Sequence, residues 1–207
     1  MRHIATLSAL VFSVACDAPD TDGSGFVLTE TRELDSFTGV EASGVNARVS
    51  VGSMQRVQVT SDDNMLSAVR TEVIDGVLFV SLDDGAWSPS TLEVSISVPS
   101  LSVIGNHDGA DMIVAGVSGD VLEVSASGIG HTELAGEVGH LIIDSSGSGT
   151  RNAQDLRAES VTVTASGSGV LWLTVEETID GHVSEDATLN VFGDPGARDV
   201  SGEVVYY

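Results

Sequence analysis

Short runs of alternating apolar and polar residues fill most of the chain after residue 26. Typical runs are NARVSVG, VLFVSLDD, TLEVSISVPS, VLEVSAS, SVTVTAS and VLWLTVEE, and clusters of Gly, Asp and Asn separate them. An alternation with a period of two places successive side chains on opposite faces of a strand. No window repeats apolar residues at helical spacing. The pattern therefore predicts an all-β chain of many short strands.

A Ser-Gly-x-Gly sequence recurs three times at almost constant spacing. It begins at Ser127, Ser146 and Ser166, after intervals of 19 and 20 residues. A fixed period of this kind is typical of a solenoid, in which each repeat forms one coil. Weaker copies flank the three, in NHDGAD before them and in VSEDATLNV after them. We therefore expect about five coils of 19–20 residues.

Aliphatic residues stand at matching places before each Ser-Gly corner. Five residues before the corner serine the chain has Leu122, Leu141 and Val161, and three before it Val124, Ile143 and Val163. The residues between them are Glu123, Ile142 and Thr162. Stacked coils would place the aliphatic positions in ladders inside the solenoid and the intervening positions outside.

The corner glycines are predicted to be structural. They are Gly128, Gly130, Gly147, Gly149, Gly167 and Gly169. A tight corner repeated in every coil needs positive φ or close backbone approach, and glycine permits both. A ligand-binding ladder is the alternative interpretation.

The first residues predict export. Residues 1–15 have a short basic start and the apolar run IATLSALVFSV, which is too short to span a bilayer and reads as a signal peptide. Cys16, the only cysteine, follows directly and resembles the lipidated cysteine of bacterial lipoproteins, although Ser13 stands where such signals usually carry Leu. The alternative is ordinary signal cleavage with Cys16 incidental. Residues 16–25 are predicted to form a flexible acidic tether, and residues 26–207 the solenoid domain.

The charge balance limits the choice of partners. The chain has 31 acidic residues against 8 basic ones, all arginine, and a formal net charge of −23. Such a surface repels phosphate backbones, so we expect no nucleic-acid partner. No later segment is apolar enough to span a membrane, so we expect membrane attachment through the N-terminal lipid alone.

Markers in a fixed order give the chain a resemblance to a known family. They are Phe37, Val40, Ser43-Gly44, Asp63-Asn64, Gly76, Pro99, Leu101, the Ser-Gly-x-Gly corners and VFGDP at Gly193–Pro195. From about residue 27 to residue 204 the chain resembles the putative auto-transporter adhesin, head GIN domain family. The resemblance implies a right-handed parallel β-solenoid of the single-stranded β-helix type. It also implies a bacterial cell-envelope protein, often lipid-anchored, and no established reaction.

A turn with one tryptophan is the candidate ligand site. Trp87 stands in the polar sequence DDGAWSPS beside Asp83 and Asp84. An exposed indole beside carboxylates could stack on a sugar of an envelope polysaccharide. The alternative is that Trp87 packs against the solenoid. Trp172, in VLWLTV, is predicted to be a strand residue that packs along the stack of coils.

Calcium is the one cofactor that we consider, and otherwise we expect none. Clustered carboxylate oxygens suit calcium, and the candidate ligands are Asp62, Asp63, Asp108 and Asp111. The alternative is that they form ordinary Asp and Asn turns. The histidines at 107, 131, 140 and 182 share no ladder position, so a transition-metal site is not expected.

The sequence thus predicts a non-enzymatic, envelope-anchored module that is adhesin-like or structural, with an envelope polysaccharide or a surface protein as partner. One alternative is a polysaccharide-acting enzyme, for which a basic cluster is needed. The best cluster is Arg151 and Arg157 near Asp155, and we interpret it instead as a surface salt bridge on an acidic face. Another alternative is an envelope-sensing partner of a membrane signalling protein.

Overall fold

The computed structural model describes residues 21–85, 87–184 and 186–207. The predicted signal peptide, Cys16 and the first part of the predicted tether lie outside these ranges. The described chain forms strands and one short 3-10 helix, Leu66–Ala68. No helix within these ranges is long and apolar enough to cross a membrane. The predicted all-β class is confirmed.

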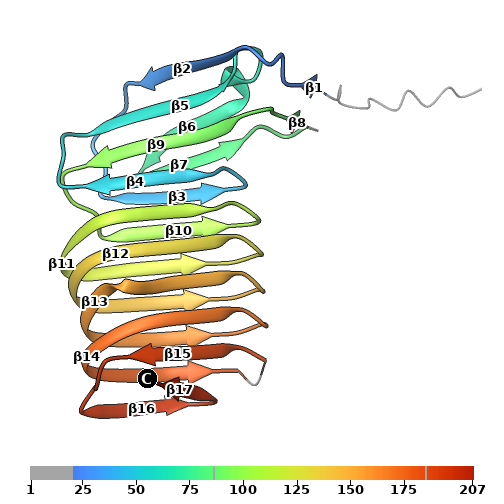
Figure 1. Ribbon diagram of the computed structural model, residues 1–207. Helices are drawn as coiled ribbons and strands as arrows, with labels where there is room; N and C mark the ends of the chain where they lie inside the picture. The colour runs from blue at the N-terminus through green and yellow to red at the C-terminus, as the bar shows by residue number, and fades with distance from the viewer. Residues whose placement is uncertain (1–20, 86, 185) are drawn as a thin grey trace, which may run out of the picture.

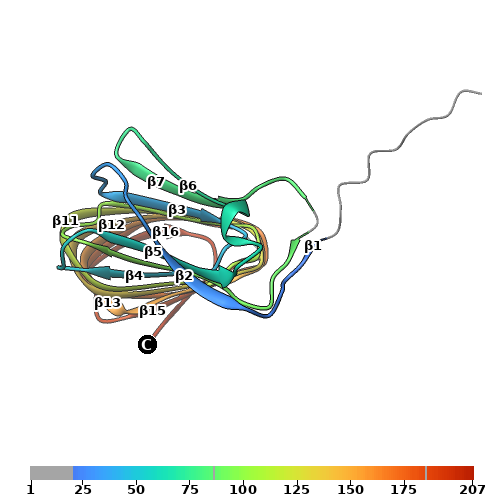
Figure 2. The same cartoon turned by 90° about the horizontal axis from the view of Figure 1, so that it is seen from above.

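One sheet of 15 strands winds around a buried core. It forms a right-handed parallel β-solenoid of about 5 turns (Figures 1 and 2). Four long strands carry the winding: β11 (Met112–Ala126), β12 (His131–Ser145), β13 (Thr150–Ala165) and β14 (Val170–Val183). Each bends midway, so that its first half lies in one wall of the solenoid and its second half in the other. We call these the front wall and the back wall.

Equivalent residues of successive coils lie side by side, because the long strands pair in parallel and in step. In the back wall Leu122 pairs with Leu141, Leu141 with Val161, and Val161 with Ile179. All four side chains are buried. The residues that follow Leu122 and Leu141 are exposed on the outer face. The predicted aliphatic ladders are therefore confirmed.

The first coils do not stack in chain order. β3 (Gly39–Ser43) and β4 (Ala47–Val51) form one coil, and β7 (Val77–Leu82) and β9 (Leu92–Val98) form the next. The later coil lies on the N-terminal side of the earlier one, since β7 pairs with β3 and β9 with β4. The chain then returns, and β10 (Val103–His107) and β11 pair with the other side of β3 and β4 (Figure 1).

Antiparallel strands cover the N-terminal end. β5 (Arg56–Asp62) pairs with β9, and β2 (Val27–Arg32) pairs with β5. β6 (Val69–Ile74) pairs with β7 on the back wall. This reversal of direction ends the parallel stack, and Figure 2 shows β2 crossing over the end of the solenoid.

Three short strands form the C-terminal end of the solenoid: β15 (Thr188–Phe192), β16 (Ala197–Ser201) and β17 (Val204–Tyr206). An aromatic stack covers their front wall. Trp172, Phe192 and Tyr207 lie with ring centroids 4.9–6.3 Å apart. The predicted packing of Trp172 along the coils is confirmed, and such ring pairs add stability beyond their buried area.

The Ser-Gly-x-Gly corners hold neighbouring coils at close backbone distance. The first glycine of each corner has positive φ, with values of 83°, 86° and 79° at Gly128, Gly147 and Gly167. A Cβ atom at any of these three would lie within 3.0 Å of the backbone of the preceding coil. The second glycines are under the same steric limit without positive φ: Gly130, Gly149 and Gly169. Both positions therefore need the absence of a side chain, and the first also needs glycine's backbone freedom.

A buried arginine lies inside one corner. Arg151 is 2% exposed, and its two terminal nitrogens donate to the carbonyl oxygens of Gly130 (2.7 Å) and Ser146 (3.2 Å). Burial lowers the pKa of Arg151. The expected surface salt bridge was wrong for Arg151, because the side chain points into the core and satisfies corner carbonyls. Arg157 does form an exposed ion pair, with Glu176.

Replacement of Gly147 by alanine tests the corner constraint. Gly147→Ala should lower the free energy of unfolding by about 2–4 kcal/mol, because left-handed backbone strain adds to a clash with the backbone of Gly128. Gly44→Ala is the matched control, since Gly44 has φ of 66° but open space around its Cβ position. We expect it to cost about 1–2 kcal/mol. Urea denaturation measures both, and equal losses would contradict the close-approach argument.

Candidate functional site

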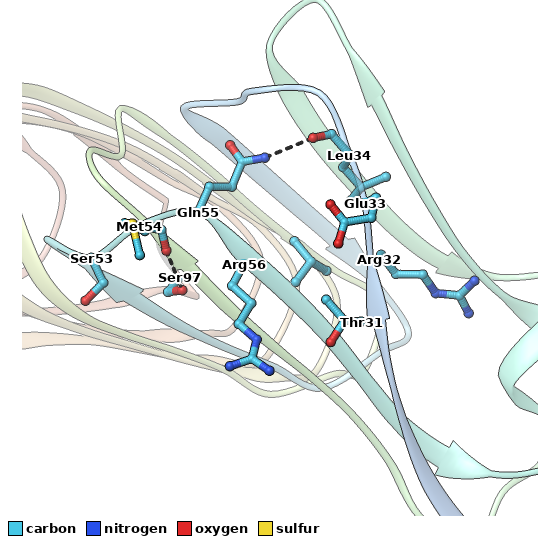
Figure 3. Close-up of a pocket in the computed structure, with 10 residues that line it drawn as sticks. Thr31, Arg32, Glu33, Leu34, Ser53, Met54, Gln55, Arg56 and Ser97 are labelled. Atoms are coloured by element: carbon cyan, nitrogen blue, oxygen red, sulfur yellow. Dashed lines mark hydrogen bonds between the residues drawn. The ribbon is translucent and has the colours of Figure 1, made fainter.

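A groove of about 500 Å³ lies at the N-terminal end, between the end of β2 and the start of β5 (Figure 3). Ten residues line it: Thr31, Arg32, Glu33, Leu34, Ser53, Met54, Gln55, Arg56, Val57 and Ser97. They come from three separate segments of the chain. We call this the fork groove.

The fork groove exists because two paired strands separate. β2 and β5 stay in register up to Arg32, which lies opposite Val57, and beyond this point the two segments part. The Gln55 side chain then bridges the gap. Its amide nitrogen donates to the carbonyl oxygens of Leu34 (3.2 Å) and Asp35 (2.9 Å), and its oxygen accepts from the Phe37 N–H (3.3 Å). One side chain therefore fixes the far wall of the groove.

The polar side chains of the fork groove differ in how they are held. A terminal nitrogen of Arg32 donates to the Leu66 carbonyl oxygen at 2.7 Å, and the guanidinium also lies 3.4 Å from Glu30. The Ser97 hydroxyl donates to the Met54 carbonyl oxygen at 2.9 Å. Met54 as a residue is 87% exposed, and its side chain so offers an apolar surface to a ligand.

A second groove continues the first across the outer face of the front wall. It has about 360 Å³, and Arg48, Ser50, Arg56, Gln58, Ser95, Ile96 and Ser97 line it. The two grooves share Arg56 and Ser97. Strand β9 lies between β4 and β5, with Ser95 opposite Arg48 and Ser97 opposite Arg56. We call this second part the arginine groove.

The predicted site at Trp87 has a different geometry. Trp87 is half-buried, and its indole N–H donates to the Asp83 carbonyl oxygen at 2.7 Å. Strand β8 (Trp87–Ser88) pairs with β1 (Thr21–Asp22). The Asp83 carboxylate pairs with Arg70, and Asp84 lines a shallow groove beside it. The structure thus brings Asp83 and Asp84 to one groove, whose lining does not include Trp87, and the sugar-stacking role of Trp87 stays a prediction.

The first pair of calcium candidates lies at the end of β5. Asp62 is fully buried and accepts hydrogen bonds from the hydroxyl and N–H of Ser90 (both 2.7 Å) and from the N–H of Gly25 (2.8 Å). The Ser90 hydroxyl, followed by backbone N–H groups, holds the pKa of Asp62 below its usual value against the opposing effect of burial. Exposed Asp63 accepts from the Ser24 hydroxyl at 2.5 Å. Both carboxylates therefore hold Ser24 and Gly25 against the end of β5. Since Thr21–Asp22 also form a strand, the predicted flexible tether over residues 16–25 is wrong for residues 21–25.

The second pair, Asp108 and Asp111, lies at a corner near the middle of the chain. Asp108 accepts from the Ser43 hydroxyl, and Asp111 accepts from the His131 N–H at 3.1 Å. Within the described ranges no three His, Cys, Asp or Glu side chains gather as a metal site would require. The calcium hypothesis thus stays a prediction.

A hydrogen-bonded histidine–serine pair recurs between neighbouring coils. Sequence reasoning missed this repeat. In each pair Nδ1 lies 2.7–2.9 Å from a serine hydroxyl: His107 with Ser127, His140 with Ser160, and His182 with Ser201. The signal was a serine 19 or 20 residues after each histidine. These bonds link adjacent coils on the outer surface.

Fold and site together define an elongated parallel β-solenoid with a polar groove at its capped end. The chain belongs to the family described as putative auto-transporter adhesin, head GIN domain, whose model matches residues 36–195. Membership fits an adhesin-like module and suggests an exported, non-enzymatic envelope protein.

Solved structures share this fold. A putative adhesin from Bacteroides fragilis has a TM-score of 0.71 at 22% identity, covering 90% of this chain and 97% of its own. A putative adhesin from Parabacteroides merdae has a TM-score of 0.65 at 18% identity, covering 90% and 98%. A putative lipid binding protein from Parabacteroides distasonis has a TM-score of 0.60 at 15% identity, covering 90% and 99%. At these identities the likeness shows the fold alone. No curated protein matches the chain.

Asp62→Asn should lower stability at neutral pH, because hydrogen bonds to a charged acceptor are stronger than those to an amide. Since the folded pKa lies below the unfolded value, the contribution of Asp62 is present above about pH 4 and is lost as pH falls through the folded pKa. The stability difference between wild type and variant should therefore shrink on acidification. Urea denaturation from pH 7 to pH 3 tests this, with Asp63→Asn as control. A difference that stays constant with pH would contradict it.

Proposed function

We propose that the protein is a non-enzymatic, adhesin-like binding module that recognises an envelope polysaccharide. The observation that supports this is the continuous groove formed by the fork groove and the arginine groove. Its lining includes side chains that hold no part of the fold, among them Met54, which is 87% exposed. Hydroxyl, amide and guanidinium groups beside an apolar surface are the groups that bind sugars in shallow sites.

The place of the groove favours a ligand close to the membrane. The groove and the first described residues lie at the same end of the solenoid (Figure 1). In this proposal Cys16 carries the lipid, and strand β1 begins at Thr21, so the link between the lipid and the folded domain is at most about 18 Å long when extended. The groove would then stay near the surface of the cell's own envelope, where polysaccharide is within reach.

A groove variant tests the function. The purified protein should bind isolated envelope polysaccharide saturably, and Met54→Glu should weaken binding at least fivefold, because it replaces an apolar surface with a charge. Trp87→Ala, checked for folding by circular dichroism, should leave affinity unchanged. The reverse result would move the ligand to the Trp87 turn, and no saturable binding would refute the proposed function.

Cys16→Ser tests the anchor. The wild-type protein should partition with the membrane fraction and incorporate labelled fatty acid when expressed in bacteria. The variant should appear in the soluble fraction without label, since a serine hydroxyl cannot take the thioether-linked lipid. Membrane association that persists in the variant would contradict lipidation at this residue.

A further inference from the structure

We propose that the ligand is an acidic oligosaccharide and that Arg48 and Arg56 bind its carboxylate or sulfate groups. This inference rests on the proposed function and names the chemical class of its ligand. The groups concerned lie in the arginine groove, whose lining holds two guanidiniums, three serine hydroxyls and an amide but no carboxylate.

Arg56 is free to bind an anion. Of the seven arginines that the described ranges contain, it is the one whose side chain has no hydrogen bond or ion pair to another described residue. The other six each have a partner: Arg32, Arg48, Arg70, Arg151, Arg157 and Arg198. In a chain with net charge −23, an exposed arginine without a carboxylate partner is exceptional. Its guanidinium can therefore form a bidentate pair with a carboxylate or a sulfate of a ligand.

The two terminal nitrogens of Arg48 are available to bind a second anionic group of the ligand. Its Nε donates to Glu93 at 3.0 Å, while both terminal nitrogens have no partner within the described structure. Glu93 thus orients the guanidinium and leaves one edge open. From the strand spacing and the pairings through β9, the Cα atoms of Arg48 and Arg56 lie about 12 Å apart. This separation suits two charged groups on different sugar units.

Hydroxyl and amide groups fill the space between the arginines. Ser50, Ser95 and Gln58 project from β4, β9 and β5 on the same outer face. Ser95 makes one long hydrogen bond, to Glu93 at 3.5 Å, and the Gln58 amide has no side-chain partner in the described structure. These groups both donate and accept hydrogen bonds, as sugar hydroxyls require.

The strong negative charge of the whole chain disfavours densely charged polymers as ligands and favours short ones with few charges. Fields of exposed charges are screened beyond about 8 Å at physiological ionic strength, so the arginines act on groups placed directly against them. A densely charged polymer would bring further phosphates or sulfates near the acidic surface and be repelled. A short oligosaccharide with a few separated charges avoids this cost.

Calorimetry with defined oligosaccharides tests the proposal. The probes are an oligogalacturonide, a sulfated galactan oligomer and a neutral galactan oligomer of equal length. We expect the charged probes to bind at least tenfold more tightly than the neutral one, and a comparison between the two charged probes identifies the preferred anion. Arg56→Gln should weaken charged-probe binding at least tenfold and Arg48→Gln about fivefold. Arg157→Gln, with the same charge change on an exposed arginine outside the groove, should change it less than twofold.

The possible outcomes separate the two proposals. Loss in both groove variants with an unaffected control supports the acidic ligand. Saturable binding that both groove variants retain, or equal affinity for the neutral probe, would overturn it and leave a polysaccharide-binding module intact. If neither these probes nor isolated envelope polysaccharide bind the wild type, the proposed function fails as well.

Discussion

Close backbone contact at the corners is the constraint on which the structure depends. The Ser148 N–H donates to the Gly128 carbonyl at 3.0 Å, and the Ser168 N–H to the Gly147 carbonyl at 2.9 Å. A side chain between these groups would force adjacent coils apart. The parallel hydrogen bonds of the long strands would then lengthen, because they continue directly from the corner. A local steric condition thus decides whether successive coils stay in register.

The regular coils could be predicted from sequence because each repeats the same local rule. Alternation gave the buried face of each strand, and the Ser-Gly period gave the coil length. The order of the first coils could not be predicted this way, since β7 and β9 lie on the N-terminal side of the coil formed by β3 and β4, and β10 and β11 then pair with its other side. Gly44 joins the corner ladder through the His107 carbonyl, at 3.3 Å and across more than sixty residues. No local pattern encodes a pairing of that separation.

The candidate site was harder to predict than the fold. Sequence reasoning selected tryptophan and aspartate residues in turns as candidate ligands. The Asp62 carboxylate instead accepts hydrogen bonds from Ser90 and Gly25 and so belongs to the fold. The arginine groove comes from separate strands, each with ordinary alternation of serine, glutamine and arginine. The sequence did hold a signal for an anion site: Arg48 and Arg56 stand at outward positions of their strands, in a chain with only 8 basic residues. Only the pairing through β9 shows that they share one face.

The division between regular and irregular coils explains why the groove lies where it does. In the regular coils most outward positions have an equivalent one coil away, so neighbouring coils repeat the same arrangement of outward side chains. A distinct site needs side chains that converge from different directions. At the N-terminal end β2 and β5 run antiparallel and then separate, and the Gln55 side chain bridges the gap between the two segments. The cap that ends the parallel stack therefore also supplies the fork that the stack itself cannot form.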